Sequence, residues 1–233
     1  MSDTLLTELA DNGVLTITLN RPEVLNSLNE TITLGLLQAL IDARTNKDVR
    51  AIVITGAGRA FCAGADLDSK SWPSPKGLSA GEATAASMDR GFNPLVKAVS
   101  QSTKPVVTAI NGIAAGGGVG LALAGDITIA SESAKFKLVF GPNLGIIPDM
   151  GASWFLPNLI GRARANGLAL LGDDLPAATA KEWGLIWDCV PAEQLLAEAQ
   201  AIAGRLADGP TIGLKAVVKA HDRAMSNTLS EQL

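Results

Sequence analysis

The sequence contains two segments of small residues that could bring backbone amides together around a ligand. One is residues 63–66, Ala-Gly-Ala-Asp, and the other is the run of Gly116, Gly117 and Gly118; each follows a predicted strand. Glycine lets the backbone approach a ligand closely, and the first amides of a following helix have no partner within that helix. If the two turns converge, their amides could stabilise an oxyanion. Small residues also permit close helix packing, which is the favoured interpretation of a single run; two such turns shift the balance modestly towards function.

Asp149 is the acid whose surroundings best suit proton transfer. It lies on a predicted turn and is flanked by Ile147 and Met150. Burial among apolar side chains would raise its pKa towards the range of a general base. The commoner role for an acid at such a position is to cap a helix, here one over residues 150–156. From the residues alone, both interpretations stay open.

Other chemical motifs in the sequence are incomplete. Gly116 and Gly118 are followed by Leu121 where a dinucleotide-binding loop needs a third glycine, and no GxxxxGK[ST] pattern occurs. Residues 77–81 match the GxSxG pattern of a serine hydrolase, and His221 follows them. However, the preceding Trp-Pro-Ser-Pro-Lys cannot form the strand that a nucleophile elbow requires, so the match is interpreted as chance. With one histidine, no HExxH and no CxxC pair, the sequence predicts no metal site.

Composition indicates one compact chain without a nucleic-acid partner. The 233 residues are 47% hydrophobic, and 19 basic against 23 acidic residues leave a net charge of −4. Nucleic-acid binding needs clustered basic residues, and a membrane span needs about 20 consecutive apolar ones; the sequence offers neither. Cys62 and Cys189 lie far apart and form no CxxC pair, which suits a thiol-reducing compartment. Acids interrupt the first ten residues, so no secretory signal is predicted. We therefore expect a cytoplasmic protein with a single domain over residues 1–233.

Strands and helices alternate along the chain, which is typical of an α/β fold. A hairpin is predicted over residues 5–19. Asn29 is expected to cap a helix whose buried face carries Ile32, Leu36, Leu37, Leu40 and Ile41. Residues 69–81, rich in Ser, Pro and Gly, are predicted to form a surface loop. Further strands are expected over residues 49–55, 105–110 and 126–130, a connection over 111–115, and helices over 116–124 and near 152–156, 162–171, 177–184, 193–206 and 211–224.

Three segments together resemble the crotonase superfamily, the enoyl-CoA hydratase/isomerase family: residues 60–67, 112–118 and 144–151. The likeness runs from about Leu5 to the end of the chain. It implies a spiral of ββα units over about residues 1–190 and a helical part over about 191–233, assembled as a homotrimer or homohexamer. It also implies an acyl-CoA thioester as substrate, with CoA as part of that substrate and no cofactor, metal, nucleic acid or membrane besides.

The resemblance also assigns site residues to positions of this sequence. The backbone N–H groups of Ala65 and Gly117 would form an oxyanion hole, which a thioester enolate needs to find already in place. The residues implied to line the CoA channel are Val24, Leu25, Ala63, Asp66 and Leu67. Pocket walls are expected from scattered apolar residues over 69–88 and from the later helices.

The sequence departs from the pattern of typical hydratases of the family, which use two glutamates. Gly120 and Gly141 stand at the matching positions, and a glycine cannot transfer a proton. Asp149 falls where a subset of the family's isomerases, including the ring-opening isomerase of phenylacetate degradation, carry a single catalytic acid. We therefore predict an enoyl-CoA isomerase in which Asp149 moves a proton between two carbons. Two alternatives remain: an enoyl-CoA hydratase, and a non-catalytic acyl-CoA-binding protein.

The sequence ends at Leu233, soon after the helix predicted over residues 211–224. The family usually continues into a further helical segment that helps to cover the acyl pocket and to pack subunits together. By this resemblance the helical C-terminal part is short for the family, which leaves pocket closure and the subunit contacts made through that segment open.

Overall fold

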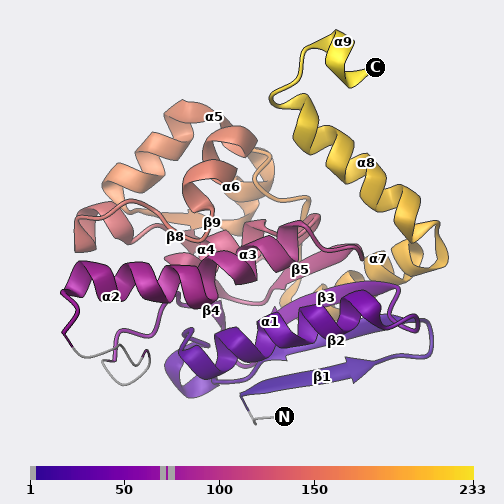
Figure 1. The fold of residues 1–233 in the computed structure, drawn as a ribbon, viewed down its shortest axis with the longest axis horizontal. Helices are drawn as coiled ribbons and strands as arrows, with labels where there is room; N and C mark the ends of the chain where they lie inside the picture. The colour runs from indigo at the N-terminus through magenta and orange to yellow at the C-terminus, as the bar shows by residue number, and fades with distance from the viewer. Residues whose placement is uncertain (1–3, 69–71, 73–76) are drawn as a thin grey trace.

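Two β-sheets form the centre of the fold in the computed structural model, which describes residues 4–68, 72 and 77–233 (Figure 1). The larger sheet has six strands in the order β1-β2-β3-β5-β7-β10, and the smaller has four in the order β4-β6-β8-β9. The six strands are Leu5–Leu9, Val14–Leu19, Ala51–Gly56, Val106–Ile110, Ile127–Ser131 and Asp188–Val190. The four strands are Ala60–Cys62, Ile113–Ala115, Lys135–Lys137 and Asp174–Pro176.

The predicted hairpin forms the edge of the larger sheet. β1 and β2 pair antiparallel from Leu5 opposite Leu19 to Leu9 opposite Leu15, and Gly13 takes a positive φ of 79° in the turn between them. The other neighbours in this sheet pair parallel. A strand buried on both faces needs no polar alternation, and the uninterrupted burial of β5 fits that pattern.

The chain spirals between the two sheets. It passes from β3 to β4, from β5 to β6 and from β7 to β8, giving one strand to each sheet before a helical segment follows. This arrangement confirms the spiral of ββα units. The helical segments are η1 (Pro22–Val24), α1 (Glu30–Thr45), α2 (Ala80–Ser87), η2 (Met88–Phe92), α3 (Asn93–Ser100), α4 (Gly117–Leu123), η3 (Phe140–Leu144), α5 (Ala152–Leu171), α6 (Ala177–Glu182), η4 (Ala192–Gln194), α7 (Leu195–Asp208), α8 (Thr211–Ala224) and α9 (Leu229–Gln232).

The larger sheet separates two hydrophobic clusters. Along β3, Ile52 and Ile54 point into the main core, whereas Ala51 and Val53 point to the opposite face, where α7 packs. This alternation is the two-residue period of a strand. The main core also holds the buried face of α1, which Asn29 caps by accepting a hydrogen bond from the Ile32 amide at 3.0 Å.

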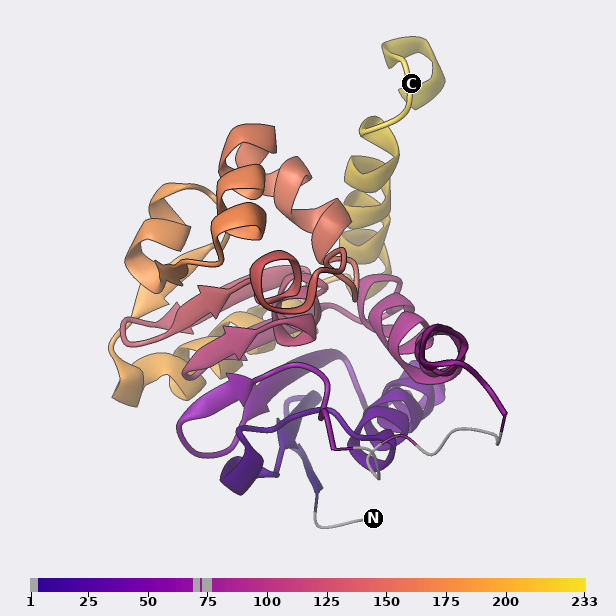
Figure 2. The ribbon, with the colours of Figure 1, turned by 90° about the vertical axis from the view of Figure 1, so that its left-hand side faces the viewer.

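Figure 1 shows α8 running along one edge of the molecule, and Figure 2 shows α8 and α9 rising from it.

Several predicted boundaries were wrong. Residues 113–115 form β6 rather than a plain connection, and Ile41 is exposed on α1. The helices expected over 152–156 and 162–171 form one span, α5, with a non-helical break at Gly161 (φ 77°, ψ 158°). Of the predicted loop over 69–81, residues 69–71 and 73–76 lie outside the described residues, and its last two residues begin α2. No helix in the described part of the chain is both long and apolar enough to cross a membrane.

Candidate active site

A cavity of about 690 Å³ opens between the ends of the smaller sheet and four helical segments. Its walls come from the residues after β4, from α2 and η2, from the start of α4, and from η3 with the loop after it. The lining residues are Ala63, Gly64, Ala65, Leu67, Trp72, Ala83, Thr84, Ser87, Met88, Phe92, Gly116, Gly117, Val139, Phe140, Leu144, Ile146 and Asp149. Asp149 is the one ionisable side chain among them, so the cavity combines apolar walls with a single acid.

The first small-residue bend follows β4 and is held by Leu28. The Leu28 amide donates to the Gly64 carbonyl at 2.8 Å, and the Leu28 carbonyl accepts from the Asp66 amide at 3.0 Å. The Ala65 amide lies between these two groups along the chain. In an extended chain it points to the opposite side, away from Leu28. Among the described residues this amide has no hydrogen-bond acceptor. It is therefore available to a ligand.

The second bend joins β6 to α4. Gly116 takes φ 52° and ψ −128° there, a conformation that side chains disfavour, and its amide donates to the Lys137 carbonyl at 3.0 Å. The next amide, that of Gly117, finds no acceptor within the described part of the chain. Gly117 is the first residue of α4, where helix amides have no partner inside the helix.

The two bends face each other at close range. A Cβ atom on Gly64 would lie 3.0 Å from the Gly117 nitrogen and 2.9 Å from the Ala115 carbonyl oxygen. Gly64 also has a φ of 92°, so both the close approach and the backbone conformation call for glycine. The two bends therefore lie against each other, which is the condition that the sequence left open.

Asp149 lies over Gly117. A Cβ atom on Gly117 would be 3.3 Å from Oδ1 of Asp149, and that oxygen is buried without a hydrogen-bond partner among the described residues. Burial raises the pKa of Asp149 from its ordinary value of 3.8 to about 6. A carboxyl group with this pKa can both take and return a proton near neutral pH.

Asp149 does not cap α5, which is the structural role that the sequence left open. Gly151 precedes the first residue of α5 with φ 80°, and no side chain caps this end. The backbone carbonyl of Asp149, rather than its carboxylate, accepts from the Ala152 amide at 2.9 Å. The carboxylate is left free to face the cavity.

Neither glycine at the two hydratase-like positions has room for a longer side chain. A Cβ atom on Gly120 would lie 2.2 Å from the Met150 carbonyl oxygen, and one on Gly141 would lie 2.7 Å from the Ala169 carbonyl oxygen. Both neighbours are backbone atoms, which cannot turn away as a flexible side chain can. The positions are therefore glycine for steric reasons in this fold.

The residues expected along the CoA channel divide into two groups. Ala63 and Leu67 line the cavity, whereas Val24, Leu25 and Asp66 lie outside its lining. The Leu25 carbonyl accepts from the Ala63 amide at 3.0 Å, which places the segment before α1 directly behind the first bend. The Asp66 carboxylate pairs with the Arg21 guanidinium at 2.9 Å and joins the same two segments.

Aromatic walls of the cavity were not predicted individually. Trp72 and Phe92 lie with ring centroids 4.4 Å apart, and the Trp72 indole N–H donates to the Leu28 carbonyl at 2.9 Å. Trp72, Ala83, Thr84, Ser87 and Met88 fall in the region over 69–88 from which walls were expected. Val139 and Phe140 come from the segment after β8, where no local pattern distinguishes a pocket residue from a core residue.

The serine-hydrolase match was correctly interpreted as chance. Ser79 caps α2 and exchanges hydrogen bonds with Glu82, at 3.3 Å from the Glu82 amide. His221 lies exposed on α8 and outside the cavity lining. No cluster of three or more potential metal ligands occurs among the described residues.

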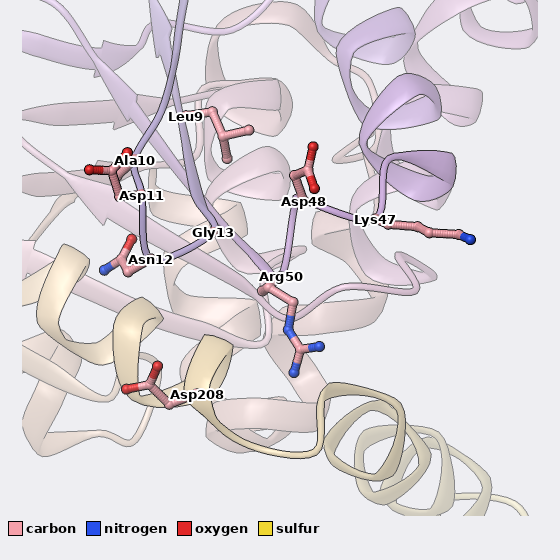
Figure 3. A pocket seen from close by; sticks show the side chains of 9 residues that line it. All are labelled: Leu9, Ala10, Asp11, Asn12, Gly13, Lys47, Asp48, Arg50 and Asp208. Atoms are coloured by element: carbon pink, nitrogen blue, oxygen red, sulfur yellow. The ribbon is translucent and has the colours of Figure 1, made fainter.

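A second hollow lies at the end of the β1–β2 hairpin and is shown in Figure 3. Arg50 reaches from the start of β3 towards the end of α7, and its side chain donates to the carbonyls of Ala207 at 3.1 Å and Gly209 at 2.9 Å. These carbonyls are among those that a helix end leaves unpaired. Arg50 therefore has a structural role in this hollow, where it pairs carbonyls at the end of α7. The hollow also lacks the apolar lining of the first cavity.

Comparisons with known proteins agree with the fold and show the family. The family model described as enoyl-CoA hydratase/isomerase matches residues 10–233. The 1,2-epoxyphenylacetyl-CoA isomerase of Escherichia coli (strain K12) is 47% identical over 223 residues, covering 96% of this chain and 84% of the relative. A probable enoyl-CoA hydratase of Rhodobacter capsulatus is 42% identical, covering 95% of this chain and 82% of the relative.

Solved structures give the same result. An enoyl-CoA hydratase from Polaromonas sp. JS666 superposes with a TM-score of 0.89 at 33% identity, covering 98% of this chain and 86% of that one. A monofunctional enoyl-CoA isomerase from M. smegmatis superposes with a TM-score of 0.81 at 30% identity, covering 99% and 98%. The fold and the paired amides define an enzyme of the crotonase type. The chain belongs to the enoyl-CoA hydratase/isomerase family.

Proposed function

We propose that this acyl-CoA enzyme is an enoyl-CoA isomerase that converts a 3-enoyl-CoA into the conjugated 2-enoyl-CoA. The observation that carries the proposal is the position of Asp149, whose buried, unpartnered Oδ1 lies beside Gly117 at the junction of the two bends. The name of the 47% identical relative, an isomerase, supports the same reaction class.

In this mechanism one carboxylate moves one proton. Asp149 removes a proton from C2 of the 3-enoyl thioester, and the electron pair of the broken C–H bond delocalises through the double bond and onto the thioester oxygen. The amides of Ala65 and Gly117 hold that oxygen while it carries negative charge. Asp149 then returns the proton to C4, which leaves the double bond between C2 and C3. The reaction is redox-neutral and releases no group, so we propose no cofactor beyond the CoA of the substrate.

The proposed substrate path uses both groups of channel residues. Ala63 and Leu67 would contact the pantetheine part of CoA where it enters the cavity, and Val24, Leu25 and Asp66 would shape the surface that leads to it. The acyl group would extend past Gly117 towards Trp72 and Phe92, because apolar walls favour an apolar chain.

The proposal is tested with Asp149→Asn, which keeps the size of the side chain and removes its basicity. We expect conversion of 3-enoyl-CoA to 2-enoyl-CoA to fall by about 100-fold or more, the usual contribution of a positioned general base. The control is Glu193→Gln, an acid exposed on η4, which is expected to keep the full rate. Equal rates for Asp149→Asn and the parent enzyme would remove Asp149 from the mechanism.

Hydration of a 2-enoyl-CoA is the second candidate, because the Rhodobacter capsulatus relative bears a hydratase name. Loss of enoyl absorbance from crotonyl-CoA in water measures that reaction directly. We expect it to be slow, since Gly120 and Gly141 provide no acid. Rapid hydration would favour the second candidate, and tight acyl-CoA binding with no exchange of the C2 proton would indicate a binding protein instead.

We also propose that the chain assembles as a homotrimer or homohexamer. Large apolar side chains are exposed on the outer helices and the loop before β10, among them Trp187, Ile212 and Leu229. Such surface commonly marks contact with another chain. Light scattering should give three or six times the mass of the chain, and the mass of a single chain would overturn this proposal.

A further inference from the structure

Met150, which follows Asp149, holds a backbone conformation that needs support from its surroundings. Its φ is 47°, in the left-handed region that a residue with a side chain rarely adopts, and only 2% of its surface is exposed. Such a conformation costs about 1 kcal/mol or more and persists where packing enforces it. Met150 is therefore held in place by what surrounds it.

Its side chain lies along one turn of α4. A Cβ atom on Gly120 would come 2.8 Å from Cβ of Met150, and one on Gly117 would come 2.6 Å from its Sδ. Residues three apart lie on the same face of a helix. The side chain thus begins over Gly120 and ends over Gly117.

The end of this side chain also adjoins the carboxyl group of Asp149. The same Cβ position on Gly117 that lies 2.6 Å from Sδ of Met150 lies 3.3 Å from Oδ1 of Asp149. A thioether has no hydrogen to donate and is a weak acceptor. Met150 therefore fills the space next to a buried oxygen without hydrogen bonding to it.

We propose that Met150 is the positioning residue that keeps water out from beneath the reacting carbons and so favours the proton shift over hydration. This inference rests on the proposed role of Asp149. Hydration needs a water molecule beside the double bond, whose oxygen bonds to C3 while one of its protons goes to a base and C2 gains a proton. Met150 is buried outside the cavity lining, and its Sδ and Oδ1 of Asp149 both lie near the same point over Gly117, so the side chain fills the space beside the base in which we place the excluded water.

Shortening this side chain should admit water. Met150→Ala removes three heavy atoms, and one water needs about 30 Å³ and two or more polar partners. Oδ1 of Asp149 is one such partner, since it has no hydrogen bond within the described residues. The amide of Gly117 is a second, before substrate binds.

The entry of water beside Asp149 can be measured through the pKa of its carboxyl group. Among the described residues no other charged side chain lines the cavity, and α4 carries none; desolvation is the main cause of the raised pKa of Asp149. A water beside the carboxylate stabilises the ionised form and lowers that pKa. The pH dependence of isomerisation therefore reports whether water has entered.

The experiment compares Met150→Ala with Met150→Leu, which retains most of the side-chain volume. For each, the apparent pKa of 3-enoyl-CoA isomerisation and the rate of crotonyl-CoA hydration are measured. We expect Met150→Ala to lower the apparent pKa by about one unit and to raise hydration about tenfold over the parent. Met150→Leu should change neither. Met150→Gly removes these three atoms and Cβ as well, and glycine tolerates the left-handed backbone. It should behave as Met150→Ala and replaces that variant if Met150→Ala does not fold.

A slower isomerisation with an unchanged apparent pKa and no added hydration would show that Met150 is only a packing residue. The same pKa shift in Met150→Leu would also overturn the inference, because the volume would then be irrelevant. Failure of the proposed function is seen separately, as full isomerase activity in Asp149→Asn.

Discussion

Asp149 owes its raised pKa to burial rather than to a charged partner. Its Oδ1 has no hydrogen bond among the described residues, and burial alone raises the pKa of the group to about 6. Burial also raises the pKa of Cys62, two residues before Gly64, but with a different consequence for reactivity. Its pKa is raised to about 12, so the thiol stays protonated and is no nucleophile near neutral pH.

The raised pKa of Asp149 predicts a measurable effect on stability. Its folded pKa of about 6 exceeds the ordinary value of 3.8, so the folded state holds this proton more tightly than the unfolded state. Folding stability therefore falls as pH rises from about 4 through 6. We expect Asp149→Asn to raise the free energy of unfolding at pH 8 by an amount on the order of 2 kcal/mol, because the buried charge is gone.

Urea unfolding at pH 8 and at pH 3.5 measures this effect. The difference between parent and variant should vanish at the lower pH, where the carboxyl is protonated in both states. A difference of the same size at both pH values would show that charge burial is not its cause. Glu193→Gln, at an exposed acid on η4, is the matched control.

At the scale of elements, α4 is defined by how closely it approaches its neighbours. Its glycines at positions 117, 118 and 120 each face backbone or side-chain atoms at distances too short for a Cβ atom. A helix so poor in side chains is weak by intrinsic propensity. Its position is fixed by burial on all sides, since every residue from Gly117 to Leu123 is buried.

Two glycine substitutions separate close approach from helix propensity. A Cβ atom on Gly118 would lie 2.1 Å from the Cys62 carbonyl oxygen, so we expect Gly118→Ala to destabilise the protein by about 1–3 kcal/mol. Gly167 lies within α5 with no such atom inside 4 Å. Gly167→Ala should stabilise by up to about 1 kcal/mol through helix propensity. Thermal unfolding measures both, and destabilisation of equal size in the two variants would contradict this view of α4.

At the scale of the whole molecule, a buried ion pair fastens the last long helix to the larger sheet. Lys215 of α8 contacts the Asp126 carboxylate at 2.6 Å, with 4% and 8% of the two side chains exposed. The other carboxylate oxygen accepts from the Val106 amide at 2.8 Å. Burial raises the pKa of Asp126 even though Lys215 opposes the shift, which shows how strongly this site is desolvated.

Removing the Lys215 ammonium group should therefore leave the buried Asp126 carboxylate unpaired, which lowers the stability of the folded protein. We expect Lys215→Met, which keeps much of the side-chain length, to destabilise the protein by about 3–5 kcal/mol. Lys219→Met, one turn further along α8 and exposed, should change stability by less than about 0.5 kcal/mol. Chemical unfolding of the two variants checks the prediction, and equal values would show that the pair does not anchor α8.

The sequence by itself determined the fold class, the long elements and the candidates for chemistry. Apolar periodicity and turn residues identified the hairpin, α1 and α8, and continuous apolar runs identified β3 and β5. Small residues after two strands and the acid at position 149 were found in the same way, and the family likeness joined them into one site. The three-residue strands β4, β6, β8, β9 and β10 were missed, because three residues are too few to show a period.

Only the tertiary structure decided which of these residues meet. Packing of two bends against each other placed the Gly117 amide within reach of Gly64, and the carboxylate of Asp149 faces the cavity because Gly151 rather than Asp149 precedes α5. The cavity draws on segments more than 80 residues apart along the chain, from Ala63 to Asp149. Such contacts depend on how segments remote in the sequence pack together, and local residue patterns do not determine that packing.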